Sequence, residues 1–560
     1  MKHSFTKAWL IVIAGTLLTA AIPFAFYQST TGDILPSILP QLETDTLYYL
    51  TQVKEIFDGH PTLGNPFIKE HADDVFPGLL LSMKLAAIPG IFGLGINMIF
   101  AVNLILYSLL TGVLLFVLCR HINSKYTVIA ALMAVLGVGI MHIDLMRPIM
   151  QTIFPAFILF MMALLWVLND IYDQKRLIAL GAITTLTFYL YPYLWMTAFT
   201  AVGLLFLRTI AQKDWRALRM QVMMIIGITV LCIPQIQAVI SLFYDESVRE
   251  LNLRIGLTKT HYVLPITLWN MKYTIATTIG LLLLRTRRKL STPEWMILLV
   301  GAALFIGSIS NVVTGKQMDF DTHFFRLSLP WNIIALVVLA GSFKSNTQKI
   351  ERLILCALCT VLFLTSINRA LIRKNSFAYL HKKDAVTASY NHVRDYDALF
   401  AFLDNDINAE QVILIPDDIG MYLALYTTHY SLYEVKAFLH TIPDDELMTR
   451  FLTHHVDRVD DVFLRENALY AVGIAPMSEA KYRRAQGEDV TYLDFLGGDT
   501  FIQNTLDQHA EIRKNYTKYL KQFSVTYAII DNRSDRNPHI PKNTTVLYDD
   551  ERFTVYEVQQ

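Results

Sequence analysis

Long apolar runs alternate with short polar segments over the first two thirds of the chain. A helix that crosses a membrane needs about 20 mostly apolar residues. By that measure the sequence predicts about eleven membrane-spanning helices, at residues 9–27, 96–118, 127–143, 148–168, 177–191, 194–208, 220–242, 263–284, 295–310, 324–341 and 352–368. The chain is therefore expected to be a polytopic α-helical membrane protein.

The segment "YPY", residues 191–193, joins the fifth and sixth runs. Proline breaks or kinks a helix, so these runs form either one long helix kinked at Pro192 or two short spans with a tight turn. We predict two spans. If the two runs formed one span, every later loop would lie on the opposite side of the membrane, and the basic segment "RTRRKL" would lie outside.

Lysine and arginine concentrate in alternate loops. If the N-terminal "MKHSFTK" is cytoplasmic, so are "CRHINSKY", "NDIYDQKR", "RTIAQKDWRALR", "RTRRKL" and "KSNTQKIER". Because cytoplasmic loops carry an excess of positive charge, the charges and the eleven spans agree. The first run is long enough to predict an uncleaved anchor, and the alternative of a cleaved signal peptide would leave the remaining topology unchanged.

Three polar regions then face the non-cytoplasmic side: the loop at 28–95, the loop at 311–325 and the tail from about residue 370. The first loop contains an apolar piece, "VFPGLLLSMKLAAIPGIFGLG", which prolines and glycines interrupt. This pattern is typical of an interfacial helix that lies along the membrane. We therefore expect a transmembrane domain at 1–370 and an extracytoplasmic domain at 371–560.

The tail alternates helix-like and strand-like runs. "YDALFAFLDND" predicts a helix, "QVILIP" and "VTYAIID" predict buried strands, and "TTVLYDDERFTVYEV" predicts a closing hairpin across "DDE". Together these runs indicate an α/β domain. The tail has no glycine-rich phosphate loop and no spacing typical of a catalytic triad, so it offers no catalytic signature.

Composition supports a membrane protein and argues against a soluble enzyme. Hydrophobic residues make up 53% of the chain and charged residues 17%. The net charge of zero hides an asymmetry: residues 1–370 carry 28 Lys and Arg against 19 Asp and Glu, and residues 371–560 carry 20 against 29. The four cysteines all lie in or beside apolar runs, so we expect neither a disulfide framework nor a zinc site.

Ionisable residues are nearly absent from the predicted spans. Lys272 is the clearest exception, and no carboxylate lies at the middle of a span. A proton-coupled or ion-coupled transporter needs such a carboxylate, so this class is disfavoured. The ionisable side chains gather instead at the outer boundary, where these could meet: Glu43, Asp45, Glu70, His71, Asp73, Asp74, Arg147, Asp319, Asp321, His323 and Arg326.

This boundary suits group transfer between a lipid-linked donor and an acceptor in water. A hydroxyl acceptor needs a base to take its proton, and the departing phosphate needs a cation. One fixed acid could be the base. Arginine is favoured for the phosphate because of its fork of donors; the candidates for this role are Arg147, Lys272, His323 and Arg326.

The layout resembles the GT-C superfamily of membrane glycosyltransferases. These proteins have an acidic motif after the first span, an interfacial helix in the same loop, many further spans and an outer C-terminal domain. "ETDTLYYL" resembles the superfamily's first-loop signature, which implies that Asp45 is the catalytic base, with Glu43 as the second candidate. "NPFIKEHADD", "DLMRPIMQ", "YPYLW" and "NVVTGKQMDFDTHFF" resemble segments of bacterial members. By that likeness Glu70 and His71 line the site, and the loop with Thr314, Gly315 and His323 covers it.

The resemblance implies an inverting enzyme of the cytoplasmic membrane. Its donor would be a polyprenyl-phosphate-linked sugar and its acceptor a glycan, lipid or protein; no nucleic acid is expected. Asp73 and Asp74 offer the oxygen ligands that Mg²⁺ or Mn²⁺ would take, although the superfamily also has metal-free members. The alternatives are a transporter or flippase of a lipid-linked glycan, and a non-catalytic scaffold.

Each candidate residue also has a structural interpretation. Asp45 could cap the helix that follows it, and Asp73 and Asp74 could cap the interfacial helix. Arg147 could reach water from a helix end. Tyr191, Tyr193 and Trp195 would belong to the aromatic belt at the membrane interface.

Overall fold

The computed structural model describes residues 2–40, 45–75, 80–122, 127–255, 258–317, 322–342 and 387–559, together with residues 357, 360 and 364. Glu43, Asp319 and Asp321 lie outside these residues. So do most of the predicted span at 352–368 and the predicted domain boundary at 370.

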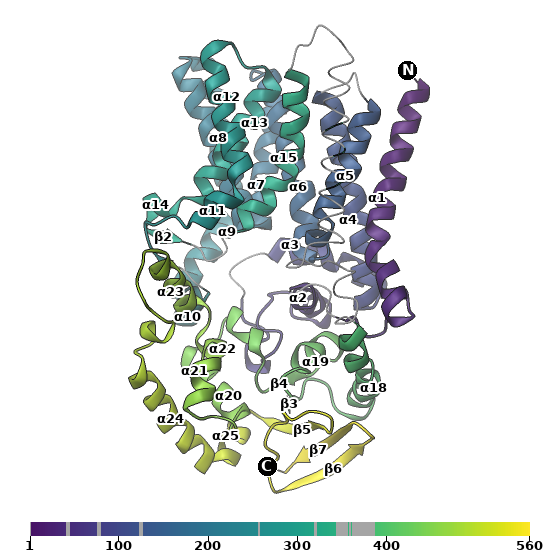
Figure 1. Ribbon diagram of the computed structural model, residues 1–560, viewed down its shortest axis with the longest axis vertical. Coiled ribbons are helices and arrows are strands. Elements are labelled where there is room, and N and C mark those ends of the chain that lie inside the picture. Colours follow the sequence, from purple (N-terminus) through teal and green to yellow (C-terminus); the bar gives the residue numbers. More distant parts are fainter. Residues whose placement is uncertain are drawn as a thin grey trace.

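Long helices form a bundle whose members run along the long axis of the molecule (Figure 1). Within the described residues, seven helices are long and apolar enough to cross a membrane, so this is a multi-pass membrane protein. The bundle helices are α1 (Lys2–Thr31), α4 (Ile96–Ile122), α5 (Thr127–Leu145), α6 (Pro148–Asn169), α7 (Gln174–Leu190), α8 (Pro192–Ala211), α9 (Trp215–Phe243), α12 (Lys272–Arg287), α13 (Thr292–Ser308) and α15 (Thr322–Ser342).

The predicted break at "YPY" into two separate helices is confirmed, and of the two helices α8 is long and apolar enough to cross a membrane. Helix α7 ends at Leu190, and α8 begins at Pro192. Tyr191 between them is extended, with φ −166° and ψ 132°, as expected for a residue before proline.

The prediction of one continuous span at 263–284 is wrong. The chain forms α11 (Pro265–Asn270) and then α12, with a break at Met271 (φ −92°, ψ 4°). Lys272 is consequently the first residue of a helix rather than a charge inside a span. A cation at that position can reach water from the helix end.

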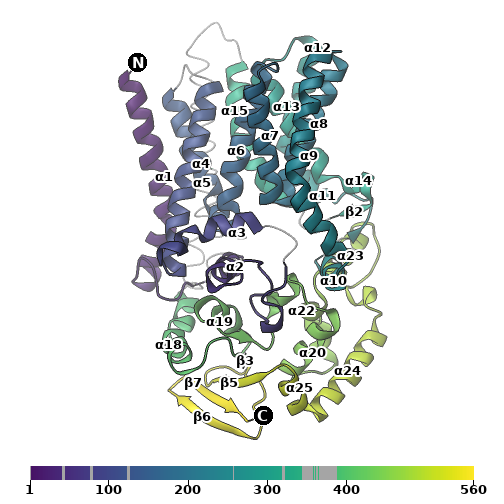
Figure 2. The same cartoon turned by 180° about the vertical axis from the view of Figure 1, so that it is seen from behind.

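The first loop forms short elements that lie across the ends of the bundle helices (Figures 1 and 2). Helix α3 contacts α2, α6 and α7, and it occupies the apolar stretch for which the sequence predicts an interfacial helix. Helix α2 ends at Gly59, whose φ of 115° is a conformation that favours a residue without a side chain. The elements are α2 (Thr46–Asp58), η1 (Lys69–His71), α3 (Leu80–Ala87) and η2 (Ile88–Phe92).

The tail folds as the predicted α/β domain around a five-stranded sheet of order β4-β3-β5-β7-β6. The pairs β4-β3 and β3-β5 are parallel, whereas β7 pairs antiparallel with both β5 and β6. The helix, both buried strands and the closing hairpin of the sequence analysis are confirmed. The strands are β3 (Val412–Leu414), β4 (Tyr430–Ser431), β5 (Val525–Asp531), β6 (Thr544–Asp549) and β7 (Phe553–Val558).

Helices pack against this sheet and connect it to the first loop, whereas β6 lies at the outer end of the molecule (Figure 1). Helix α19 contacts α2, and α20 contacts α22, α24 and α25. The helices are α18 (Tyr396–Asp406), α19 (Gly420–Tyr426), η5 (Val435–Leu439), α20 (Asp444–His454), α21 (Asp461–Asn467), α22 (Leu469–Val472), α23 (Ala475–Ala485), η6 (Leu493–Phe495), α24 (Asp499–Lys514) and α25 (Tyr516–Gln522).

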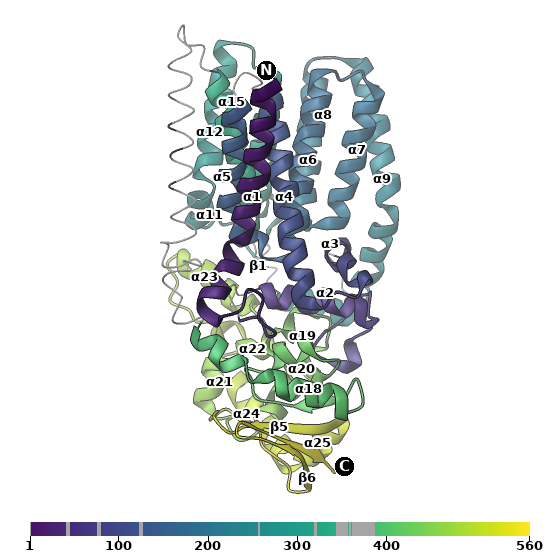
Figure 3. The same cartoon turned by 90° about the vertical axis from the view of Figure 1, so that its right-hand side faces the viewer.

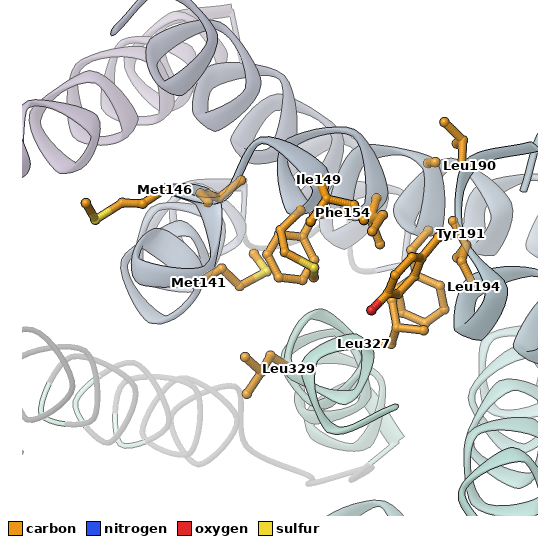
Figure 4. Packing of buried hydrophobic residues seen from close by; sticks show 14 of the residues in the cluster. Met141, Met146, Ile149, Phe154, Leu190, Tyr191, Leu194, Leu327 and Leu329 are labelled. Carbon is orange, nitrogen blue, oxygen red and sulfur yellow. The ribbon is translucent and has the colours of Figure 1, made fainter. Parts of the chain in front are cut away.

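The described parts of the three polar regions of the sequence analysis lie at one end of the bundle (Figures 1 and 3). The region that begins at residue 311 forms α14 (Asn311–Thr314) and β2 (Lys316–Gln317), and β2 pairs with β1 (Thr258–Lys259), which follows α10 (Glu246–Arg254). Apolar packing closes the bundle beside them: Tyr191 lies near Leu190, Leu194 and Leu327 (Figure 4). The polar end therefore rests on a densely packed apolar layer.

Candidate functional site

Asp45 directly precedes α2, but its side chain makes no capping hydrogen bond. The capping interpretation of this residue is therefore wrong. Its carboxylate faces two cations instead: Oδ2 lies 3.2 Å from Arg147 Nη1, and Oδ1 lies 3.9 Å from Lys436 Nζ. The Asp45 side chain is 32% exposed and that of Arg147 11%, so water reaches the acid more easily than the arginine.

Three parts of the chain converge on this carboxylate. Asp45 comes from the first loop, Arg147 from the start of α6 in the bundle, and Lys436 from η5 in the tail. Pro148 at the first position of α6 favours an extended conformation for Arg147, which has φ −84° and ψ 121°. This bend separates α5 from α6 and brings the arginine to the polar end of the bundle.

A second ion pair lies beside the first. Arg326 Nε on α15 is 3.6 Å from Asp144 Oδ1 at the end of α5. Both side chains are largely buried, at 17% and 9% exposure. The sequence reasoning did not single out Asp144, although "DLMRP" places it three residues before Arg147 at the end of an apolar run.

His323 connects this ion pair to the tyrosines of the α7–α8 turn. Arg326 Nη1 lies 3.4 Å from His323 Nε2 and can only donate to it, so the histidine's proton belongs on Nδ1. That nitrogen hydrogen-bonds to the Tyr191 hydroxyl. The Tyr193 ring centroid is 4.9 Å from the His323 ring. Both tyrosines are 3% exposed, so their assignment to an aromatic belt is wrong.

We call Asp45, Arg147, Lys436, Asp144, Arg326, His323, Tyr191 and Tyr193 the junction cluster. Arg147 and Arg326 both act electrostatically on His323, which places the two ion pairs in one neighbourhood. The cluster thus offers a partly exposed carboxylate beside the Arg147 guanidinium and the Lys436 ammonium, with a second guanidinium, that of Arg326, next to His323. A guanidinium has five donors arranged to match carboxylate or phosphate oxygens, so the cluster can hold an anion next to an acid.

Glu70 and His71 belong to a different group of charges, between the first loop and α20. Glu70 Oε2 is 2.7 Å from Arg450 Nη2, and Arg450 also pairs with Glu446 at 2.7 Å. His71 bridges Asp74, at 2.7 Å, and Glu446, at 3.2 Å. We call Glu70, His71, Asp74, Glu446 and Arg450 the docking cluster, because its members fasten the tail to the first loop.

Asp73 and Asp74, the predicted metal ligands, hydrogen-bond to different histidines. Asp73 is 86% exposed and lies 2.8 Å from His60 Nδ1, whereas Asp74 pairs with His71. Within the described part of the chain, one group of three side chains is close enough to hold a metal ion, and it lies elsewhere, in the tail. A metal role for Asp73 and Asp74 stays a prediction.

The remaining candidate cation, Lys272, lies over the Trp269 ring, with Nζ 3.5 Å from the centroid. Tyr273 is its second aromatic neighbour, at 5.2 Å. Its role toward a phosphate stays a prediction. His323 lies within α15, so it does not belong to a loop that covers the site. In the segment that precedes it, Gly315 has φ 67° and packs against His261.

Comparison with known proteins gives a distant likeness. No family model matches the sequence, and no curated protein matches it. Among solved structures, the apo oligosaccharyltransferase of Archaeoglobus fulgidus is 13% identical, with a TM-score of 0.40, and the match covers 93% of this chain and 69% of that one.

The same archaeal protein also matches in a second structure, in complex with an inhibitory peptide and a dolichol-phosphate. That match has 13% identity, a TM-score of 0.36, and coverage of 94% of this chain and 70% of that one. At these values the likeness establishes neither the fold nor the activity of this chain. Both have to be argued from its own residues.

Proposed function

We propose that this protein is a GT-C type glycosyltransferase, which moves a sugar from a polyprenyl-phosphate-linked donor to an acceptor. One observation carries the proposal: the Asp45 carboxylate lies beside Arg147 and Lys436 at the polar end of a membrane bundle. Lipid surrounds the bundle and water reaches the acid. A lipid-linked donor and a water-borne acceptor can meet at such a boundary.

The reaction assigns one role to each charge. Asp45 takes the proton of the acceptor hydroxyl as its oxygen attacks the anomeric carbon of the sugar. The bond from that carbon to the phosphate oxygen breaks, and its electron pair stays on the phosphate. Arg147 and Arg326 stabilise the added negative charge. Attack opposite the leaving group inverts the anomeric centre.

The ion pairs of the cluster are compatible with these roles. Arg147 approaches Asp45 through Nη1, and a guanidinium has further N–H donors for a phosphate. Arg326 is oriented by Asp144 and His323. Since the neighbours of each arginine fix its direction, little reorganisation is needed when an anion arrives, and such preorganised charge is the main source of electrostatic catalysis.

We derive no step through a metal ion. The carboxylates of Asp73 and Asp74 hydrogen-bond to two different histidines, so as arranged they do not form a set of ligands for Mg²⁺ or Mn²⁺. In the proposed placement the protein lies in the cytoplasmic membrane, with its N-terminus cytoplasmic and its tail outside. The basic alternate loops support this orientation.

A transporter or flippase is the first alternative. It would need a polar path through the bilayer, whereas the charges of the junction cluster lie at helix ends. A scaffold that binds partners through its tail is the second alternative. It would not need the Asp45 carboxylate.

The test is an in vitro assay with purified protein, polyprenyl-phosphate sugars and an extracted acceptor fraction, measuring release of polyprenyl phosphate. We expect Asp45→Ala and Asp45→Asn to abolish release while the protein remains folded. Asp73→Ala is the matched control, an acid of the same loop that is 86% exposed. Release that survives in both Asp45 variants would refute the proposal.

A further inference from the structure

Three side chains capable of binding a metal converge in the tail, away from the junction cluster. Asp417 lies shortly after strand β3, His454 is the last residue of α20, and His455 follows it. One donor atom from each lies within 4.8 Å of the others. The two histidine side chains are 1% and 6% exposed and that of Asp417 is 26% exposed, so the group is nearly closed to solvent.

The spacing of these atoms matches that of ligands around one small cation. Asp417 Oδ1 is 2.8 Å from His454 Nε2 and 3.6 Å from His455 Nδ1. Zinc binds nitrogen at about 2.0–2.1 Å and carboxylate oxygen at about 2.0–2.2 Å, so neighbouring ligands of a tetrahedral site are about 3.3 Å apart. The two measured distances lie on either side of that value.

The donor types select the kind of metal. Two imidazole nitrogens and one carboxylate oxygen suit zinc, whereas Mg²⁺ and Ca²⁺ prefer oxygen ligands alone. We propose that Asp417, His454 and His455 bind one Zn²⁺ ion, with a water molecule as the fourth ligand. The expectation of no zinc site followed from the cysteines alone, and none of these ligands is a cysteine.

Arg458 contacts the second carboxylate oxygen of Asp417, and this contact is compatible with a cation bound at the first. Its Nη2 lies 2.9 Å from Asp417 Oδ2, which leaves Oδ1 to the metal and orients the carboxylate, as outer-shell partners do. Arg458 also donates to His455 Nδ1. Zinc binding would replace that hydrogen bond while the contact with Asp417 remains.

The site would join two elements that matter for the rest of the molecule. It links the segment after β3 to the end of α20, and α20 carries Glu446 and Arg450 of the docking cluster. Zinc would thereby hold α20 in the position that receives the first loop. This role is independent of the proposed transfer reaction, because no residue of the junction cluster contributes a ligand.

The test uses full-length protein in detergent, stripped with EDTA, incubated with ZnCl₂ alone and dialysed. We expect about one zinc per chain by mass spectrometry of the metal, and a melting temperature that rises by a few degrees with zinc and falls again with EDTA. Cobalt in place of zinc should give the visible absorption bands of a tetrahedral site.

Asp417→Asn is expected to lose the bound zinc and the cobalt bands. Asp418→Asn is the matched control, since among the described residues Asp418 pairs with one histidine, His392, and it should keep both signals. Wild-type protein that retains no zinc after dialysis would overturn the proposal, and so would an Asp417→Asn variant that binds as much as wild type. Because the EDTA experiment needs no variant, a folding defect in Asp417→Asn cannot hide the answer.

Discussion

The junction cluster and the docking cluster contain the same kinds of side chain but differ in what their charges contact. In the docking cluster Arg450 is 1% exposed and contacts two carboxylates at 2.7 Å. In the junction cluster Asp45 keeps one third of its surface exposed, and its distances to cations are 3.2 and 3.9 Å. The acids of the two clusters are similarly exposed, Glu70 at 39% and Asp45 at 32%, so the difference lies in the distances. Close pairs hold parts of a protein together, whereas looser pairs can exchange a partner for a substrate.

The largest expected difference between the clusters is in the rate of transfer. We expect Arg326→Ala to lower the rate of polyprenyl phosphate release by about 100-fold or more, since removing one donor to a developing anion costs that much. Arg450→Ala should lower it far less at a temperature where both proteins are folded, because Arg450 pairs with Glu70 and Glu446, to which the proposed reaction assigns no role. Initial rates at saturating donor measure both. Equal losses of rate in the two variants would contradict the proposed difference between the two clusters.

Stability should show the opposite ranking. Arg450→Ala removes a buried guanidinium that pairs with Glu70 and Glu446 and donates to the Leu432 carbonyl, and a buried acceptor that loses its donor costs about 1–3 kcal/mol. We expect the free energy of unfolding of the tail to fall by about 2 kcal/mol, measured by hydrogen exchange of the α20 amides. The control is Arg465→Ala, whose pairs with Asp461 and Asp499 are exposed and contribute little to stability. A control that destabilises α20 as much would disprove the docking role.

The docking cluster should also respond to pH. Burial acts to lower the pKa of His71, but hydrogen bonds to Glu446 and Asp74 outweigh it and raise the pKa above 6.5. Burial acts to raise the pKa of Glu446, but its bonds to His71 and Arg450 lower it below 4.5. The His71 contribution is complete below pH 6.5 and is lost as pH rises through the raised pKa. That of Glu446 is present above pH 4.5 and is lost as pH falls through the lowered pKa.

We therefore expect the tail to be most firmly docked between about pH 4.5 and 6.5. Above this window the free energy of unfolding of the wild type should fall as His71 loses its proton. His71→Gln should remove that fall, because glutamine does not titrate. Melting temperatures of both proteins from pH 5 to pH 9 provide the measurement, and parallel curves would show that His71 is not the titrating group.

The smallest effect is expected for Asp73→Ala. This side chain is 86% exposed, and substitutions at such positions change stability by less than about 0.5 kcal/mol. Transfer should be unchanged both with and without Mg²⁺ or Mn²⁺. Loss of a metal-stimulated rate in this variant would instead restore the metal role predicted for Asp73.

Sequence patterns predicted the helices and strands well, but they predicted only in part which residues come into contact. Apolar runs gave the bundle helices, and alternating residues gave the strands and hairpin of the tail, because both signals are local. The residues around Asp45 come from positions about 100 and 400 residues apart. Hydrophobic periodicity carries no information about contacts between residues so far apart in the sequence. The resemblance to a motif selected Asp45, but nothing local distinguishes Lys436 from the other lysines of the tail.

Glu70 and His71 show the same limit of prediction from sequence. They stand in a charged stretch of the first loop, 25 residues after Asp45, and the sequence suggests one shared site. The structure turns them toward α20 instead. Which acid faces a substrate and which faces the tail depends on the path of the loop, and that path is fixed by packing over the whole molecule.

The position of Lys436 also has a consequence for how the protein is made. Arg147 and Asp45 leave the ribosome early, whereas Lys436 lies far downstream. At about 5–20 residues per second, synthesis needs on the order of 15 to 60 s to proceed from the arginine to the lysine. The surroundings of Asp45 are therefore incomplete until the last third of the chain has been synthesised and has folded against it. A nascent copy truncated before that point would carry the membrane helices but lack the second cation at Asp45.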